Sequence, residues 1–388
     1  MTSSLPSVAV VVTLHNGAPW IQDTLASVQG QTHQPVEIVV LDDHSTDDGP
    51  ELAAAVPGVS VLPIWRPSVK GAGPGRQCGF EHTSAPFVAF LDQDDLWHPD
   101  HLRLLATALV DRPSCPAAVA RFTLFDDGAP PSYDAPHLDT ALLDPWDRFP
   151  LSSIITPSGV LVRRSALDTI GGWPTVGPIT DFLTWFHLSV DRPFVENQCA
   201  TCAYRVHDSS HSARNKSLRR ATYLQYKVDI LTPLLHQRKS RLPNQALSLQ
   251  IRLDALQAGG VLAAAYDAGT PTRIPDAAPA LERLATKEPA HFDQLASFLF
   301  QYFLGPSYYK GGPERQTAFL EILLASWPSS APESKRRLEA MFIPTFSMWA
   351  FLAFLRHNPF QLYRWSLGLT AARWRLRRRL PALYQWPW

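Results

Sequence analysis

The sequence of 388 residues lacks several features that would place a protein in a class at once. No stretch reaches the roughly 20 consecutive apolar residues of a membrane-spanning helix. The first residues show no basic start followed by an apolar run and a cleavage site, so we expect no secretory signal. Four cysteines are too few for a disulfide scaffold in a chain of this length, which favours a reducing compartment, and we expect the protein in the cytoplasm.

Net charge is missing as well, because 35 Lys and Arg residues balance 35 Asp and Glu residues. Hydrophobic residues make up 45% of the chain, which is enough for a large core and excludes general disorder. The length predicts roughly two domains. One segment departs from the even balance of charge: residues 341–388 contain seven Arg, no acidic residue and 12 aromatic residues.

The first third of the sequence alternates strand and helix patterns. Apolar runs predict strands at residues 7–12, 36–41, 59–62 and 87–91, as expected of strands that are buried on both faces. Helical spacing of apolar residues predicts helices at 20–28, 45–56, 76–81 and 99–110, with a glycine-rich turn at 71–75. This order predicts an α/β fold with a mostly parallel sheet flanked by helices.

Polar residues follow three of the predicted strands. Thr13 ends the first, Asp42 and Asp43 end the second, and an acidic run at 92–95 ends the fourth. Open sheets of this kind bind ligands at the carboxyl ends of their strands, so the three clusters should converge on one edge. A dinucleotide-binding fold would need its glycine fingerprint after the first strand, where it is absent. The later glycine-rich stretch has Arg76 in place of the third glycine, so we set that alternative aside.

The run Asp92-Gln93-Asp94-Asp95 carries the most chemistry. Carboxylates clustered at a strand end repel one another unless a cation neutralises them. Oxygen ligands suit Mg²⁺ or Mn²⁺, which bridge to a diphosphate in many sites. A solvated turn followed by a helix cap would use the same residues. At this point the sequence therefore leaves a metal site and a structural turn both open.

Several segments, taken together and in order, make a family resemblance specific. They are Asp42, Asp43, Ser45 and Asp47; Gly71, Arg76, Gln77 and Gly79; the unbroken Phe-Leu-Asp-x-Asp-Asp-x-Trp-x-Pro at 90–99; and the segments 157–164, 171–173 and 204–207. On these motifs the N-terminal 210 residues resemble a family 2 glycosyltransferase with the GT-A fold, with Gln77 in place of the usual Asn. The match covers more than half of the chain.

The resemblance implies a nucleotide-sugar donor and inverting transfer to a hydroxyl on a saccharide or lipid-linked acceptor, in envelope or surface polysaccharide synthesis. Carried over by position, Thr13 and Asp43 should contact the base or ribose, and Arg76 the nucleotide side. Each has a structural alternative: Thr13 would only end its strand, Asp43 would cap the next helix, and Arg76 would pair with a carboxylate.

The resemblance also implies a metal site for Mn²⁺ or Mg²⁺. Asp92 and Asp94 match the Asp-x-Asp motif, with Asp94 as the direct metal ligand, Asp92 shared between donor and metal, and Asp95 in support. His207 stands where many relatives place a histidine that contacts metal or phosphate, and a purely structural role is equally open for it. A bound dication offsets the charge that develops on the departing diphosphate.

An inverting transferase needs a base that removes the proton of the acceptor hydroxyl. Relatives place this Asp in Glu-Asp before an apolar helix that contains Asp-x-Trp. Here Asp181 keeps the position of the base and Trp185 keeps its place, whereas Thr180 replaces the Glu and Leu183 the later Asp. The alternative is that Asp181 only caps a helix that begins at Phe182.

The whole chain is thus predicted to hold a GT-A catalytic domain at 1–212, a mainly α-helical domain at 213–340 and a basic aromatic tail at 341–388. Aromatic and Arg side chains suit the surface of an anionic membrane, so the tail would place the enzyme peripherally on the inner face of the cytoplasmic membrane. A partner-binding or core-packed tail is the alternative. Nucleic acid is not an expected partner, because the catalytic edge is acidic.

Two further classes remain as alternatives. A non-catalytic sugar-nucleotide-binding or scaffold protein could retain the same fold, and the replacements at Thr180 and Leu183 leave room for it. A nucleotidyltransferase is the weaker alternative, because the segment around Asp181 would have no purpose there. The Cys199-x-x-Cys202 pair offers two of the four ligands that structural zinc needs, so a buried strand is the favoured interpretation of it.

Overall fold

The computed structural model describes residues 4–64, 71–126, 128–134, 136–146, 155–177, 179–207 and 220–241, with isolated positions at 250, 282, 332, 333 and 336. The chain divides into two compact units, Met1–Ser217 with Ile230–Asn244, and Leu218–Asp229 with Gln245–Trp388. Apart from the isolated positions, the helices predicted beyond residue 241 and the tail at 341–388 lie outside the described residues. The predicted domain limits therefore stay predictions.

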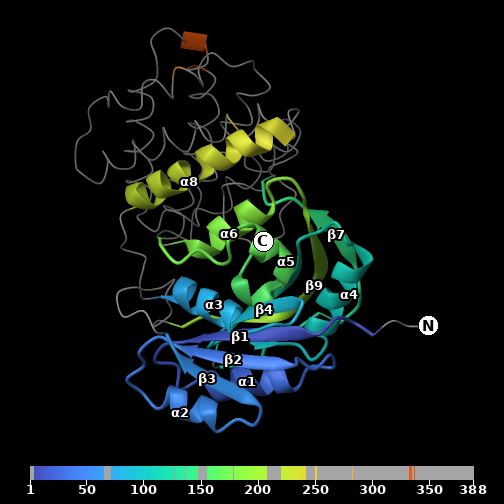
Figure 1. Ribbon diagram of the computed structural model, residues 1–388, viewed down its shortest axis with the longest axis vertical. Coiled ribbons are helices and arrows are strands. Elements are labelled where there is room, and N and C mark those ends of the chain that lie inside the picture. Colours follow the sequence, from blue (N-terminus) through green and yellow to red (C-terminus); the bar gives the residue numbers. More distant parts are fainter. Residues whose placement is uncertain are drawn as a thin grey trace, which may run out of the picture. The chain divides into compact units, whose positions relative to one another are not determined.

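The described elements follow the predicted alternation of strands and helices (Figure 1). In chain order they are β1 (Val8–Leu14), α1 (Ile21–Gln29), β2 (Glu37–Asp42), α2 (Gly49–Ala54), β3 (Val59–Pro63), α3 (Ala72–Glu81), β4 (Phe87–Asp92), β5 (Leu96–Trp97), α4 (His101–Asp111), β6 (Ala117–Phe125), β7 (Thr140–Leu143), the short 3₁₀-helix Pro157–Gly159, β8 (Val160–Arg163), α5 (Arg164–Thr169), α6 (Thr180–Leu188), β9 (Phe194–Arg205) and α8 (Arg220–Arg241).

The nine strands of the described residues form one sheet in the order β3-β2-β1-β4-β8-β6-β9-β5, with β7 paired to β9. The first four strands are parallel, which confirms the α/β fold expected from the alternating pattern. Beyond β4 the sheet is mixed: β8 runs antiparallel to β4 and β6, whereas β9 runs parallel to β6. The carboxyl ends of β1, β2 and β4 thus meet at one edge.

The core consists of two apolar layers, one on each face of the sheet. Val8, Val10 and Val12 of β1 pack in one layer with buried residues of α1, α2 and α4. Val11 points to the other layer, which contains buried residues of α3, α5 and α6. Alternate residues of a strand face opposite sides of the sheet, so an unbroken apolar run such as residues 8–12 is what a strand covered on both faces requires.

Two helices begin earlier than the sequence pattern predicted. The stretch expected to be a turn at 71–75 forms the first turn of α3, with Gly71 as its N-cap at φ 113°. Pro74 fits there, because the first turn of a helix does not use the N–H that proline lacks. Helix α6 starts at Thr180 with Ile179 as its N-cap, so Asp181 lies inside the first turn and is not the cap.

Helix α8 is the one described element that follows β9. Its later part belongs to the first unit, where the Arg238 guanidinium donates to the backbone oxygen of Ser189 at 2.8 Å and pairs with Asp144. Arg238 is 1% exposed, so this half of the helix is anchored by a buried charge pair. Among the described residues, no helix has both the length and the apolar character needed to cross a membrane.

Candidate active site

The ends of β1 and β4 bring three of the predicted site residues into direct contact. Thr13 and Asp92 occupy paired positions of the two strands, and the Thr13 hydroxyl donates to Asp92 Oδ1 at 3.3 Å. The same oxygen accepts from the Arg76 guanidinium at 2.5 Å. The side chain of Arg76 is 6% exposed and that of Asp92 28% exposed. Arg76 therefore pairs with a carboxylate, as its structural alternative expected, and this partner is Asp92, the first residue of the acidic run.

Asp43 lies at the end of β2 beside this group. Its Oδ2 accepts the backbone N–H of Gly71 at 2.7 Å, and its Oδ1 is 3.2 Å from His44 Nδ1. Its backbone oxygen is 2.6 Å from His15 Nδ1. Helix α2 starts at Gly49 with Asp48 as its N-cap, so the alternative that Asp43 only caps that helix is wrong. Asp43 instead ties the end of β2 to the start of α3.

The acidic run holds Asp94 against His207, which lies two residues after the end of β9. His207 Nε2 lies 2.8 Å from Asp94 Oδ2, and the Trp20 and His207 rings stand 4.2 Å apart. Burial and the neighbouring Asp92 carboxylate raise the pKa of Asp94, while the bond to His207 acts in the opposite direction. Asp94 thus carries a charge that its surroundings only partly offset.

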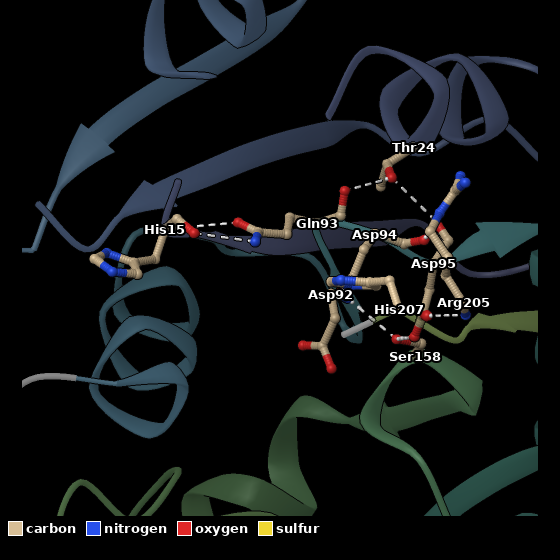
Figure 2. Close-up of polar contacts among 9 residues, drawn as sticks. All are labelled: His15, Thr24, Asp92, Gln93, Asp94, Asp95, Ser158, Arg205 and His207. Carbon is tan, nitrogen blue, oxygen red and sulfur yellow. Dashed lines mark hydrogen bonds and ion pairs between the residues drawn. The ribbon is translucent and has the colours of Figure 1, made fainter. Parts of the chain in front are cut away.

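Asp95 is buried and accepts only from neutral donors in the contacts described around it. Ser158 donates its hydroxyl to Oδ2 at 2.5 Å, and the backbone N–H of Arg205 donates to Oδ1 at 3.0 Å. The Ser158 oxygen in turn accepts the backbone N–H of Asp92 at 3.1 Å (Figure 2). Desolvation, followed by repulsion from Asp94 and Asp92, raises the pKa of Asp95 well above its usual value. Asp95 therefore fixes the shape of the turn.

Gln93 joins the acidic run to the turn after β1. Its amide oxygen accepts the backbone N–H of His15 at 2.6 Å, and its amide nitrogen donates to the backbone oxygen of His15 at 3.1 Å (Figure 2). The Thr24 hydroxyl donates to the backbone oxygen of Gln93 at 2.7 Å. Sequence reasoning missed Gln93 and Ser158, because their partners are more than 60 positions away along the chain.

Asp181 lies in the first turn of α6 and is half-buried. The helix is linked to the group around Asp92 through Trp173: the Arg76 guanidinium lies 5.1 Å from the centre of the Trp173 ring, and the indole N–H donates to the Thr180 hydroxyl at 3.3 Å. Asp181 follows Thr180 directly. The candidate base thus stands next to a residue that contacts Trp173, whose ring lies beside Arg76.

The arrangement was tested for a metal site. Among the described residues, no group of three or more His, Cys, Asp and Glu side chains could hold a metal ion by itself. Asp92 and Asp94 nevertheless fit the way in which Mg²⁺ binds many enzymes, through one or two carboxylates with substrate phosphates completing the shell. Burial is the main cause of the raised pKa of Asp94, and the neighbouring Asp92 carboxylate adds to it; a cation would offset this second contribution.

None of the four cysteines, all of which lie in the described part of the chain, forms a disulfide. Cys199 and Cys202 are buried in β9, as the favoured interpretation expected. The Cys199 sulfur is 3.2 Å from His137 Nδ1, a contact that the sequence pattern did not suggest.

Comparisons with known proteins find one family and several similar chains. Residues 9–171 match the family model described as glycosyl transferase family 2. The putative teichuronic acid biosynthesis glycosyltransferase TuaG of Bacillus subtilis (strain 168) is 26% identical over 232 residues, which are 58% of this chain and 90% of that protein. The UDP-Glc:alpha-D-GlcNAc-diphosphoundecaprenol beta-1,3-glucosyltransferase WfaP of Escherichia coli is 31% identical over 90 residues, 23% of this chain and 36% of that protein.

Among solved structures, the mannosyltransferase PcManGT from Pyrobaculum calidifontis, in complex with GDP-Man and Mn²⁺, is similar with a TM-score of 0.49 and 18% identity. The match covers 84% of this chain and 88% of that one. The chain thus spans most of the length of TuaG but about a third of WfaP and less of several other relatives, such as 16% of a Rickettsia conorii glycosyltransferase.

Proposed function

Because residues 9–171 belong to glycosyl transferase family 2 and the chain is a glycosyltransferase, we propose that it moves a sugar from a nucleotide-sugar donor to an acceptor hydroxyl with inversion. The proposed setting is the synthesis of an envelope or surface polysaccharide, on a saccharide or lipid-linked acceptor. The names of TuaG, a teichuronic acid glycosyltransferase, and WfaP, which acts on a diphosphoundecaprenol-linked sugar, support this setting.

One observation carries the proposal. The Thr13 hydroxyl and the Arg76 guanidinium donate to the same oxygen of Asp92 at the carboxyl edge of the sheet, and Asp94 lies two residues further on. In this proposal Thr13 and Asp43 contact the base or ribose. Arg76 contacts the nucleotide diphosphate, whose negative charge would take over the contact that Asp92 makes here. A buried guanidinium suits this task, because its planar set of donors matches phosphate oxygens.

Asp94 and Asp92 would hold Mn²⁺ or Mg²⁺ together with the diphosphate, and His207 would support Asp94 or bind the ion itself. When bound, the ion supplies positive charge that stabilises the departing diphosphate. His207 lies at 2.8 Å from Asp94 and packs on Trp20, so the segment after β9 is held over the acidic turn. Asp95 would keep the turn in shape through Ser158 and Arg205.

Asp181 is the proposed base. The acceptor oxygen attacks the sugar carbon from the face opposite the nucleotide, the bond from that carbon to the diphosphate oxygen breaks, and the hydroxyl proton passes to the Asp181 carboxylate. One displacement of this kind inverts the configuration at the sugar carbon. The place of Asp181 supports the role, since it is half-buried in the first turn of α6, directly after the Thr180 that contacts Trp173.

The test is a donor-binding and turnover experiment on the full chain. UDP-glucose, UDP-N-acetylglucosamine and GDP-mannose are screened by thermal shift with and without MnCl₂, and donor hydrolysis is then measured with the stabilising sugar nucleotide. We expect stabilisation that depends on Mn²⁺ and is lost in Asp94→Asn. We expect Asp181→Asn to keep donor binding and to lose turnover by at least about a hundredfold, as removal of a general base does.

The matched control is Asp168→Asn, which changes an exposed aspartate of the neighbouring helix α5. Its turnover should equal that of the wild type. Turnover of Asp181→Asn at the wild-type rate would show that Asp181 is not the base. Metal-dependent donor binding without turnover on any acceptor would contradict catalysis and favour a binding protein.

A further inference from the structure

Two positions at which this chain departs from the family motifs meet at a single residue. Gln77 stands where the family pattern has Asn, and its amide oxygen accepts the backbone N–H of Trp173 at 2.5 Å. Thr180 stands where the pattern has Glu, and its hydroxyl accepts the indole N–H of Trp173 at 3.3 Å. Trp173 is 2% exposed, and its contact with Thr180 is buried, whereas its contact with Gln77 is partly buried.

The Trp173 ring also contacts the donor side of the proposed site. The Arg76 guanidinium lies 5.1 Å from its centre, and Arg76 is the residue that pairs with Asp92. The ring of Phe90, two residues before Asp92 on β4, lies 4.5 Å from it. On the other side Trp173 meets Trp185 of α6 edge to face at 5.3 Å. One buried ring thus contacts α3, β4 and α6.

Thr180 is packed so closely that its size matters. A Cβ atom added to Gly73 of α3 would lie 2.8 Å from both the hydroxyl and the methyl group of Thr180. The backbone of α3 therefore rests on this side chain, and Thr180 is 8% exposed. A longer acidic side chain would have to displace α3 or turn away from Trp173. The small hydroxyl is what allows the first turn of α6 to lie against α3.

We propose that Trp173 and Thr180 form a positioning pair that orients Asp181. The indole N–H fixes the Thr180 side chain, Thr180 fixes the first turn of α6, and Asp181 is the next residue of that turn. The pair replaces the family's Glu with a neutral contact and ties the base to Arg76 through one ring. This inference rests on the proposed function, in which Asp181 accepts the proton of the acceptor hydroxyl.

The test compares four substitutions in the full chain. Thr180→Val keeps the shape of the side chain and removes the acceptor of the indole N–H, whereas Thr180→Ser keeps the hydroxyl. Trp173→Phe keeps an aromatic face for Arg76 and removes the indole N–H. The matched control is Ser189→Ala, which removes a buried hydroxyl at the other end of α6 that donates to the backbone oxygen of Trp185 at 2.7 Å.

We expect Thr180→Val and Trp173→Phe each to lower kcat about tenfold or more while the donor KM stays within about twofold, because a misplaced base slows the chemical step without weakening donor binding. The double variant should be no slower than the slower single variant, since both remove the same contact. Thr180→Ser and Ser189→Ala should stay within about twofold of the wild-type kcat. Equal losses of kcat in Trp173→Phe and Ser189→Ala would overturn the proposal.

A second measurement separates this inference from the proposed function. The indole N–H signal of Trp173 is assigned in a ¹⁵N spectrum by its absence from Trp173→Phe, and it should move in Thr180→Val but keep its place in Thr180→Ser. An unmoved signal in Thr180→Val would show that the pair does not exist. A wild-type chain that turns over no donor would refute the proposed function and the positioning role, and the indole signal would still decide whether the pair exists.

Discussion

Buried His101 predicts how the stability of the catalytic unit depends on pH. Its side chain is fully buried, stacks on Trp97 at 4.7 Å and lies 2.9 Å from the Thr201 hydroxyl. Burial lowers its pKa from 6.5 to about 3, with a smaller contribution from the positive charge that His98 can carry. At mildly acidic pH, His101 therefore binds a proton in the unfolded chain but stays neutral in the folded chain.

The sign and size follow from this difference. A group whose pKa is lower in the folded state contributes stability that is present above the unfolded pKa of 6.5 and is lost as pH falls below it. With a folded pKa of about 3, the free energy of unfolding should fall by about 2 kcal/mol between about pH 7.5 and about pH 5 on account of His101 alone. Asp94 and Asp95, whose pKa values are raised in the folded state, act in the opposite direction, because they favour the folded state as pH falls.

The assay compares urea unfolding of the wild type and His101→Phe at the two pH values. Phe keeps a ring against Trp97, and the carboxylates are unchanged, so the difference between the two slopes isolates His101. We expect the wild type to lose about 2 kcal/mol more than the variant on acidification. Equal losses in both proteins would refute the reasoning, because they would mean that the folded state can protonate or hydrate this histidine.

Three further predictions concern the sheet edge. Gly79→Ala should destabilise the unit by about 1–3 kcal/mol in urea unfolding, because the added methyl group would lie 2.3 Å from a methyl carbon of Val11. Ser158→Ala removes the hydroxyl that donates to buried Asp95 and should cost about 1.5–3 kcal/mol by the same assay, with Ser158→Thr as a partial rescue. Asp94→Asn should leave the melting temperature without ligand close to that of the wild type and abolish the further rise that Mn²⁺ and a sugar nucleotide cause; a full rise in the variant would exclude Asp94 as a ligand.

The strand ends that carry the site could be predicted because their signals are local. An unbroken apolar run such as 87–91 identifies a buried strand, and parallel order then places its carboxyl end beside that of 7–12. The contact of Thr13 with Asp92 follows from that placement alone. Asp94 and His207 are also in contact. For this pair the prediction of a common site came from the family motifs and not from the periodicity of apolar residues.

What the pattern could not predict depends on contacts between distant parts of the chain. The 12-residue strand β9 pairs with β5, β6 and β7, and its pairing with β6 shifts register near Arg121. The local spacing of apolar residues predicts neither the pairing nor the shift. Ser158 and Gln93 take their roles from partners 63 and 78 positions away. The start of α3 was placed too late because glycine and proline usually end helices, whereas here they occupy its first turn.

The three carboxylates of the acidic turn differ in what surrounds them, and this difference assigns their tasks. Asp95 is 1% exposed and its described contacts are to neutral donors, so changing it should disturb the turn before it disturbs a ligand. The side chains of Asp92 and Asp94 are 28% and 19% exposed, and each faces a basic partner, Arg76 or His207. An arriving diphosphate and cation could exchange with these two pairs without unfolding the turn, because Asp95 holds it independently. Under the proposed function, the site is therefore expected to be shaped before its ligands bind, and ligand binding should rearrange charge pairs while the backbone stays in place.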